Sequence, residues 1–149
     1  MAWIQKQLVL RPYPRGFHLV TGEILAQTPA ISQFRIGLAH LFIQHTTPSL
    51  CLNERIETEV RSDMESHFSR MVPENMDYYS HAYEGPDDMP AHIKSVILGS
   101  GLIIPIFQGQ LNLGRWQGIY LCEHRNQAGS RRLVITLHGD FSVQKPGED

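Results

Sequence analysis

The chain has 149 residues, a length that suits one domain with a sizeable hydrophobic core. Hydrophobic residues make up 42% and charged residues 19%, a balance that excludes the highly charged class of disordered proteins. Thirteen basic residues against 15 acidic ones give a net charge of -2, which argues against a broad cationic face for nucleic acid. We therefore expect a single domain over 1–149 with no nucleic-acid partner.

The N-terminal third predicts strands with one short helix between them. Residues 3–10 alternate in polarity, with the apolar residues on one parity, and residues 17–20 form a second candidate strand. Thr21 is a candidate cap for a short helix that ends near Pro29. Residues 35–44 are apolar on both parities, which predicts a central strand covered on both faces.

The clearest helix is predicted over 54–71, where apolar residues recur at spacings of three and four. These are Ile56, Val60, Met64, Phe68 and Met71. Asn53 lies at the expected start of this helix. The segment 73–90 that follows is polar, acidic and rich in tyrosine, and compact domains usually keep loops of this length when they have a function.

The C-terminal part predicts a short helix, three strands and a frayed tail over Lys145 to Asp149. The helix begins at Asp87 or Asp88 and ends before Gly99. The strands are expected over 102–107, 112–124 and 131–138, and their short connections predict an antiparallel β-meander. The expected class is therefore α+β, with one mixed or antiparallel sheet packed against helices.

The two cysteines, Cys51 and Cys122, are too few for a disulfide framework and are not spaced as Cys-x-x-Cys. We expect two reduced, buried thiols. The N-terminal segment lacks the pattern of a signal peptide, and the longest apolar stretch, 96–107, is interrupted by glycines and Pro105. These features predict a cytoplasmic protein without a membrane segment.

Eight histidines are many for this length, and three of them fall where a shared cleft could expose them. His45 follows the strand 35–44, His81 lies in the long loop, and His92 lies in the first turn of the next helix. Because imidazole is the commonest zinc ligand and an open site needs about three ligands, these histidines are candidate metal ligands. The alternative is a hydrogen-bonded core His45 with solvated or capping His81 and His92. Structural roles are expected for the others, His18, His40, His67, His124 and His138.

Glu123 shares one strand face with Ile119 and Leu121, so its carboxylate is expected to point inward. A buried carboxylate needs a cation, a hydrogen-bond donor or a metal, which makes Glu123 a candidate acid or base, or a partner of a metal-binding histidine. The alternative is a simple ion pair with one of the nearby arginines, Arg125, Arg131 or Arg132.

Several residues are candidates for binding a phosphate. Asn53 lies at an expected helix start, where free N–H groups favour anions, and Lys94 and Arg125 carry positive charge. Thr46, in the turn after His45, adds a hydroxyl. The alternative is that the arginines on these hairpins are solvated.

Three blocks together resemble the YjbQ family. They are HTTPSLCLNE (45–54), HAYEGPDDMPAHIK (81–94), and GQLNLGRWQGI (109–119) with Glu123 and Arg125 beyond it. The resemblance spans nearly the whole chain, although Thr47 and Pro48 depart from the usual His-Thr-Ser-Ala wording. It implies a small α+β fold that assembles as a homotrimer, with a His-rich site near a subunit boundary that often holds zinc. His45, His81 and His92 match the histidine positions of the family.

The resemblance also implies a reaction, because the family is described as a secondary thiamine-phosphate synthase. This reaction joins hydroxymethylpyrimidine diphosphate to a thiazole phosphate and releases diphosphate. We expect His45, His81 and His92 around a divalent metal, with Glu123 as their partner or as a base and with charge for the substrate from Lys94 and Arg125. The alternatives are a metal-dependent hydrolase and a non-catalytic trimer that binds a metabolite or a metal.

Overall fold

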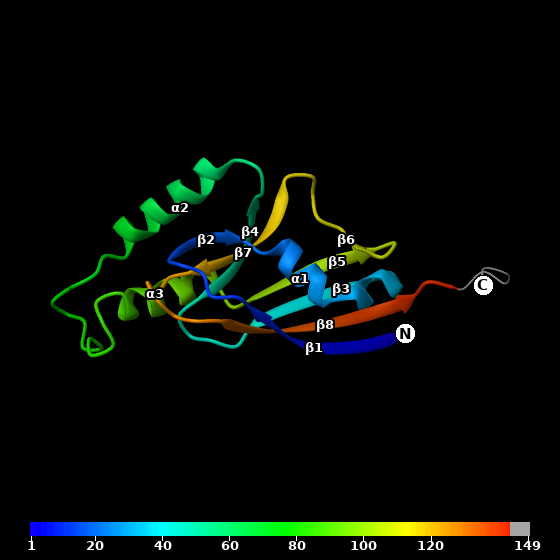
Figure 1. Cartoon of the computed structure of the whole chain (residues 1–149), viewed down its shortest axis with the longest axis horizontal. Helices are drawn as coiled ribbons and strands as arrows, with labels where there is room; N and C mark the ends of the chain where they lie inside the picture. The colour runs from blue at the N-terminus through cyan, green and yellow to red at the C-terminus, as the bar shows by residue number, and fades with distance from the viewer. Residues whose placement is uncertain (144–149) are drawn as a thin grey trace.

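The computed structural model describes residues 1–143, which form two antiparallel sheets and three α-helices (Figure 1). The expected α+β class is therefore confirmed. Both sheets are antiparallel at every strand pair described, which confirms the antiparallel alternative. The prediction of a single sheet is wrong, because the described strands form two. The tail expected to fray, Lys145 to Asp149, lies outside the described residues.

The larger sheet has five strands and the smaller has three. In spatial order, the larger sheet contains β1 (Ala2–Leu10), β8 (Arg131–Phe141), β3 (Phe34–Ile43), β5 (Gly101–Phe107) and β6 (Gln110–Leu111). The smaller contains β2 (Gly16–Leu19), β7 (Gln117–Glu123) and β4 (Ser49–Glu54). The helices are α1 (Thr21–Gln27), α2 (Thr58–Met71) and α3 (Asp88–Leu98), with a 3-10 helix, η1, over Pro29–Gln33.

The main core lies between the two sheets. Leu41 and Ile135 of the five-stranded sheet belong to one buried cluster with Leu121 of the smaller sheet and Ile24 of α1. A second cluster lies on the other face of the smaller sheet and contains Phe17, Phe68, Tyr120 and Cys122. Helix α2 contacts β2 and α3 contacts β4, so the two longer helices cover this second face (Figure 1).

The outer face of the five-stranded sheet carries no further layer within residues 1–143. On β1 the predicted alternation is confirmed, because Leu8 and Leu10 are fully buried. On β3 from residue 36 onward only one parity is buried, including Leu41, whereas Leu38 and Phe42 are 49% and 44% exposed. The prediction of a strand covered on both faces is therefore wrong for this chain by itself.

The segment before α2 is a strand, so the predicted helix start at Asn53–Glu54 is wrong. Residues 49–54 pair with β7, with Ser49 opposite Cys122 at one end. The carboxylate of Glu54 accepts the N–H groups of Ile56 and Glu57 at 2.6 and 3.0 Å, which turns the chain before α2 begins at Thr58. Strand pairing and this turn outweigh the helical spacing of the segment.

The chain after α3 does not form the predicted meander. Helix α3 itself matches the prediction, since Asp87 is its N-cap and Gly99, at a φ of 99°, follows its last residue. Residues 112–116 form a turn in which the Gly114 N–H donates to Gln117 Oε1 at 2.8 Å, and the chain then crosses to the other sheet. Because β7 is buried on both faces from residue 118 onward, it takes the central position between β2 and β4.

None of the described helices combines the length and the apolar character that a membrane-spanning helix requires.

Candidate functional site

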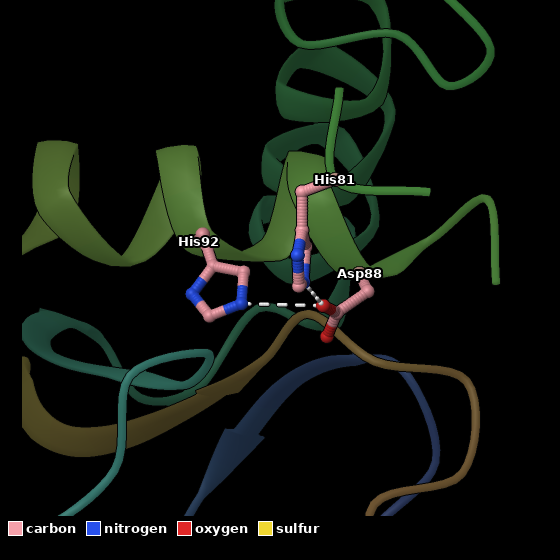
Figure 2. Close-up of side chains that lie close together, drawn as sticks. All are labelled: His81, Asp88 and His92. Atoms are coloured by element: carbon pink, nitrogen blue, oxygen red, sulfur yellow. Dashed lines mark hydrogen bonds and ion pairs between the residues drawn. The ribbon is translucent and has the colours of Figure 1, made fainter. Parts of the chain in front are cut away.

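His81, Asp88 and His92 form a compact cluster at the start of α3. Both imidazoles are directed at one carboxylate oxygen, and His81 Nε2 and His92 Nε2 lie 2.5 and 3.2 Å from Asp88 Oδ2 (Figure 2). The three ligand atoms lie within 4.8 Å of one another. Asp88 is only 1% exposed, whereas the imidazole side chains are about one-third exposed, at 32% and 31%. The cluster therefore consists of one buried carboxylate and two histidine side chains that are partly exposed to solvent.

Local structure explains why these residues meet. Asp88 and His92 are four residues apart on α3, which places them on the same face of the helix. His81 comes from the loop that precedes the helix, and its ring lies 5.3 Å from that of His92, centroid to centroid. The long loop between α2 and α3 thus returns to the first turn of α3.

The carboxylate of Asp88 is held in its charged form. Burial by itself would raise the pKa of Asp88, but the hydrogen bond from His81 and the positive charge of Arg125 outweigh it and lower the pKa below its usual value. The second oxygen, Oδ1, accepts a hydrogen bond from Arg125 Nη1 at 2.6 Å. Asp88 thus connects the two histidines to a guanidinium group.

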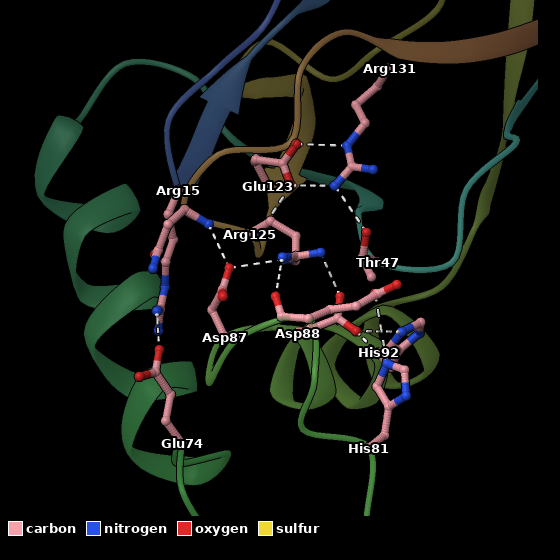
Figure 3. Close-up of polar contacts among 12 residues, drawn as sticks. Arg15, Thr47, Glu74, His81, Asp87, Asp88, His92, Glu123, Arg125 and Arg131 are labelled. Atoms are coloured by element: carbon pink, nitrogen blue, oxygen red, sulfur yellow. Dashed lines mark hydrogen bonds and ion pairs between the residues drawn. The ribbon is translucent and has the colours of Figure 1, made fainter.

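Arg125 ties the loop to the segment that follows β7 (Figure 3). Besides Asp88, it contacts Asp87 Oδ2 through Nε at 2.9 Å and the Glu84 carbonyl through Nη2 at 3.0 Å. The Asn126 N–H also donates to Asp87 Oδ2, at 2.9 Å. Most of the donors of Arg125 are therefore already bonded within the chain.

Glu123 is paired, as the simpler of the two sequence interpretations predicts. Its two oxygens accept from Nε and Nη2 of Arg131, both at 2.7 Å, and Nη2 also donates to Thr47 Oγ1 at 3.0 Å (Figure 3). Glu123 is fully buried and Arg131 is nearly so. The carboxylate of Glu123 therefore fixes the strand ends behind the cluster.

His45 does not lie with His81 and His92. Its Nε2 accepts the backbone N–H of Arg132 at 2.8 Å, which matches the hydrogen bond of the alternative interpretation, a hydrogen-bonded core histidine. The side chain is half-buried, so the core position is wrong. Burial lowers the pKa of His45, and the charges of Arg131 and Arg132 lower it further. Among residues 1–143, the cluster with the spacing of a metal site consists of His81, Asp88 and His92.

The four candidate phosphate ligands are dispersed. Asn53 lies on β4, where its Oδ1 accepts the N–H of Glu54 at 2.8 Å. Lys94 is 1% exposed and follows His92 by two residues, so it faces the opposite side of α3. Arg125 contacts the cluster through Asp88, as described, and Thr46 lies beside the cluster on the side of His92. With His92, it lines a hollow of about 420 Å³ completed by Ser95, Val96, Gly99 and Ser100.

The interior near Lys94 is polar. Burial and the charge of Arg15 lower the pKa of Lys94, and three carboxylates act in the opposite direction, those of Glu65, Glu74 and Asp87. Arg15 itself contacts Glu65 and Glu74, both at 2.8 Å. Lys94 is therefore a buried cation near the partly exposed ion pairs that Arg15 forms with Glu65 and Glu74.

Asp88 was not predicted as a site residue, because its position before an apolar segment indicates a helix cap. The pattern that could have identified it is the spacing of four residues between Asp88 and His92 on a predicted helix. No comparable pattern exists for Arg125 and Asp88, which are far apart in the sequence and meet only through the fold.

Comparison with known proteins gives a consistent set of relatives. A family model described as "UPF0047 protein YjbQ-like" matches residues 6–140. The UPF0047 protein YjbQ of Escherichia coli O157:H7 is 53% identical over 138 residues, covering 93% of this chain and 99% of that protein. The Salmonella typhimurium protein of the same name is 49% identical with the same coverage. The crystal structure of an uncharacterised YjbQ/UPF0047 protein from Clostridium acetobutylicum superimposes with a TM-score of 0.78 at 29% identity, covering 89% of this chain and 99% of that one.

Proposed function

The chain belongs to the UPF0047 family of YjbQ-like proteins, and from this relationship and its His–Asp–His cluster we propose that it binds a divalent metal and acts on a phosphorylated small molecule. The observation that carries the proposal is the convergence of His81, Asp88 and His92 on one point. Zinc is the first candidate metal, because two imidazoles and one carboxylate form a common ligand set of open zinc sites.

The spacing of the donor atoms supports a small ion. Zinc bonds of about 2.0–2.2 Å in a tetrahedral arrangement hold the donor atoms roughly 3.3 Å apart. The separation of 3.2 Å between His92 Nε2 and Asp88 Oδ2 already has this value. His81 Nε2, at 2.5 Å from the same oxygen, needs a side-chain shift of less than about 1 Å. His81 lies in a loop and is partly exposed, so a shift of this size is available to it.

Arg125 supports the cluster from behind. In metal sites, a ligating side chain is typically held in its orientation by a hydrogen bond to an atom that does not bind the metal. Here Arg125 Nη1 holds Asp88 Oδ1, which leaves Oδ2 directed at the two histidines. The pair of Glu123 and Arg131 then holds the strand ends on which Arg125 depends.

The hollow beside His92 is the proposed substrate position. Thr46 and Ser100 supply hydroxyl groups there, and the apolar wall comes from Val96. Lys94 is buried and Arg125 is hydrogen-bonded to Asp87, Asp88 and Glu84, so neither is placed as the free phosphate-binding cation that the sequence predicts. A bound divalent ion supplies the positive charge that phosphate oxygens require. Thr46 and His92 would orient the substrate against it.

The first reaction to consider is the thiamine-phosphate synthase reaction that the family resemblance implies. The substrates would be hydroxymethylpyrimidine diphosphate and a thiazole phosphate, and the chain would have to neutralise the leaving diphosphate and exclude water. Metal-dependent hydrolysis is the second candidate. It is favoured by the number of protein ligands, because three leave a coordination position for water.

We further propose that the protein is a homotrimer, joined through the outer face of the five-stranded sheet. This face is apolar and exposed, with contributions from Trp3, Leu38, Phe42, Ile103 and Phe107. Exposed apolar patches of this kind mark protein interfaces.

Metal content by elemental analysis tests the site. Protein purified without chelator is expected to hold close to one equivalent of metal per chain, and the His81→Ala, Asp88→Asn and His92→Ala variants are expected to lose most of it. His67→Ala, on α2, is a matched control that should retain the metal. A wild-type protein that stays metal-free after incubation with zinc would refute the proposal.

The His45→Ala variant distinguishes two candidate sets of metal ligands. One is the cluster seen in the structure, and the other is the His45–His81–His92 set expected from the sequence. Retention of metal in His45→Ala supports the structural cluster, and loss of metal restores His45 as a ligand. Turnover assays with both phosphorylated substrates then follow on metal-loaded protein. Binding of these compounds without conversion, for the wild type and His92→Ala alike, would favour a non-catalytic binding module.

A further inference from the structure

Cys51 and Cys122 lie side by side between β4 and β7, with their sulfur atoms 3.5 Å apart. Both are free thiols in the structure; Cys122 belongs to the buried cluster on the helix-covered face of the smaller sheet, and the partly buried Cys51 packs against that cluster. We propose that this pair is a redox-sensitive site, in which Cys51 and Cys122 form a reversible disulfide bond on exposure to a peroxide. This inference does not depend on the proposed metal site.

The strand register brings the two thiols together. Cys122 pairs with Ser49, and Cys51 pairs with Tyr120, so the two cysteines are diagonal neighbours on one face of an antiparallel pair. A disulfide bond requires the sulfurs to approach by about 1.5 Å, to about 2.0 Å. Diagonal neighbours lie about 7–8 Å apart, slightly beyond the separation of about 7 Å that a disulfide spans without backbone movement. Closing the bond therefore strains β4 and β7, and a strained disulfide is one that mild reductants can break.

The two thiols differ in a way that suits consecutive roles. Cys51 is partly exposed, whereas Cys122 is fully buried. The Cys122 thiol donates its hydrogen bond to the Cys51 sulfur, which lowers the pKa of Cys51 and raises that of Cys122. Cys51 is therefore the thiolate that meets the oxidant, and Cys122 is the thiol that completes the bond.

The chemistry balances with hydrogen peroxide as the oxidant. The Cys51 thiolate attacks one peroxide oxygen, the O–O bond breaks, and the departing hydroxide takes up a proton to form water. The resulting sulfenic acid on Cys51 is attacked by the Cys122 sulfur. The S–O bond breaks, the thiol proton leaves with the hydroxide as a second water, and two thiols have together lost two electrons.

The disulfide would join two strands that lead directly into the site region. Strand β4 starts just after Thr46 and Thr47, and β7 ends at Glu123, two residues before Arg125. A covalent link between β4 and β7 would therefore fix the relative positions of both chain segments.

The test is peptide mapping of the natively folded wild-type protein after treatment with hydrogen peroxide and alkylation of the remaining thiols. The expected product is a peptide pair linked between Cys51 and Cys122, lighter by two hydrogens and fully returned to thiols by dithiothreitol. Three results would overturn the proposal: both thiols unchanged, Cys51 over-oxidised to a sulfinic acid while Cys122 remains a thiol, or a disulfide between two chains.

Single variants test the order of events. In Cys122→Ser, Cys51 is expected to accumulate as a sulfenic acid that dimedone traps, and in Cys51→Ser the buried Cys122 is expected to stay reduced. Trapping on Cys122 in the Cys51→Ser variant would contradict the assigned order. Because Cys122 is a core residue, circular dichroism must show that its variant folds, and the wild-type peptide map decides the main question without it.

Discussion

Glu123 and Arg131 form a two-point ion pair that is almost completely removed from solvent, with side chains 0% and 7% exposed. Both hydrogen bonds measure 2.7 Å, and Thr47 satisfies a further donor of the guanidinium group. Because the pair joins the end of β7 to the start of β8, it holds together the two segments that carry Arg125 and the backbone partner of His45.

Glu123→Gln is expected to destabilise the fold strongly, because it leaves the Arg131 guanidinium buried without a counter-charge. Breaking one partner of a buried pair costs about 3–5 kcal/mol in free energy of unfolding. Urea denaturation measures the loss. Arg132→Ala, one residue along β8 with an exposed side chain, should change the stability by less than about 0.5 kcal/mol. Equal stability of Glu123→Gln and the wild type would show that the pair contributes nothing.

His124 should make the stability depend on pH. Burial, with the charges of Lys94, Arg15 and Arg131, lowers the pKa of His124 from 6.5 to about 3 in the folded protein. The unfolded chain therefore takes up a proton below about pH 6.5 that the folded protein refuses until about pH 3. The contribution of neutral His124 to the free energy of unfolding should be complete above pH 6.5. It should decrease as the pH falls, by at most about 1.4 kcal/mol for each pH unit.

The control for His124 is His124→Gln, whose amide can still bond Ser49 Oγ, the present partner of His124 Nε2 at 2.8 Å. Urea denaturation at pH 7 and pH 4.5 should show a smaller loss of stability for this variant than for the wild type. Parallel pH profiles for the two proteins would mean that folding does not lower the pKa of His124.

Arg125→Ala should weaken the proposed metal site without removing a ligand. Loss of the hydrogen bond to Asp88 Oδ1 frees the carboxylate to rotate, and changes of this kind reduce metal affinity by about 10–100-fold. Competition with a zinc-binding dye measures the affinity. Arg70→Ala, on the exposed surface of α2, is the matched control and should bind as the wild type does. An unchanged affinity in Arg125→Ala would separate Arg125 from the site.

Ile103→Glu should disrupt the proposed trimer. Ile103 is 65% exposed on the outer face of the five-stranded sheet, so a carboxylate there is tolerated by a single chain but not by an apolar interface. Size-exclusion chromatography with light scattering should show a trimer for the wild type and a monomer for the variant. A monomeric wild-type protein would contradict the proposal, as would a variant that still forms trimers.

Gly37→Ala should destabilise the fold by about 1–3 kcal/mol or more, because the close approach of β3 and β8 leaves no room for a side chain. A Cβ atom at Gly37 would lie 2.4 Å from the His138 carbonyl oxygen. Gly22→Ala is the control, since a Cβ atom there has no neighbour within 4 Å and α1 favours alanine. Thermal unfolding of both variants compares them, and similar midpoints would show that the strands can separate slightly at no cost.

Local patterns identified the elements whose structure depends on neighbours in the sequence. The alternation before Leu10 and the cap and glycine around α3 are of this kind, and both agree with the structure. The helical spacing from Ile56 onward correctly predicts most of α2, but it cannot show that residues 49–54 pair with β7, because that pairing joins segments more than sixty residues apart.

The same limit applies to the site. His81 and His92 were predicted, and the helical spacing of Asp88 and His92 was available but was interpreted as a cap. His45 was grouped with them because it follows a strand, whereas the fold directs its Nε2 to the backbone of Arg132. Lys94 has a charge that suggests a ligand contact, but its position two residues from His92 turns it toward the interior.

The position of β8 also determines how the chain completes its fold during synthesis. The last strand of the described chain lies between β1 and β3, and its register with β1 extends from Arg131 opposite Leu10 to Gly139 opposite Ala2. Until the ribosome releases this segment, β1 lacks its hydrogen-bonded neighbour and β3 exposes one edge. A nascent chain therefore has two unpaired strand edges until β8 has been synthesised, although β1 is the first strand of the sheet to leave the ribosome.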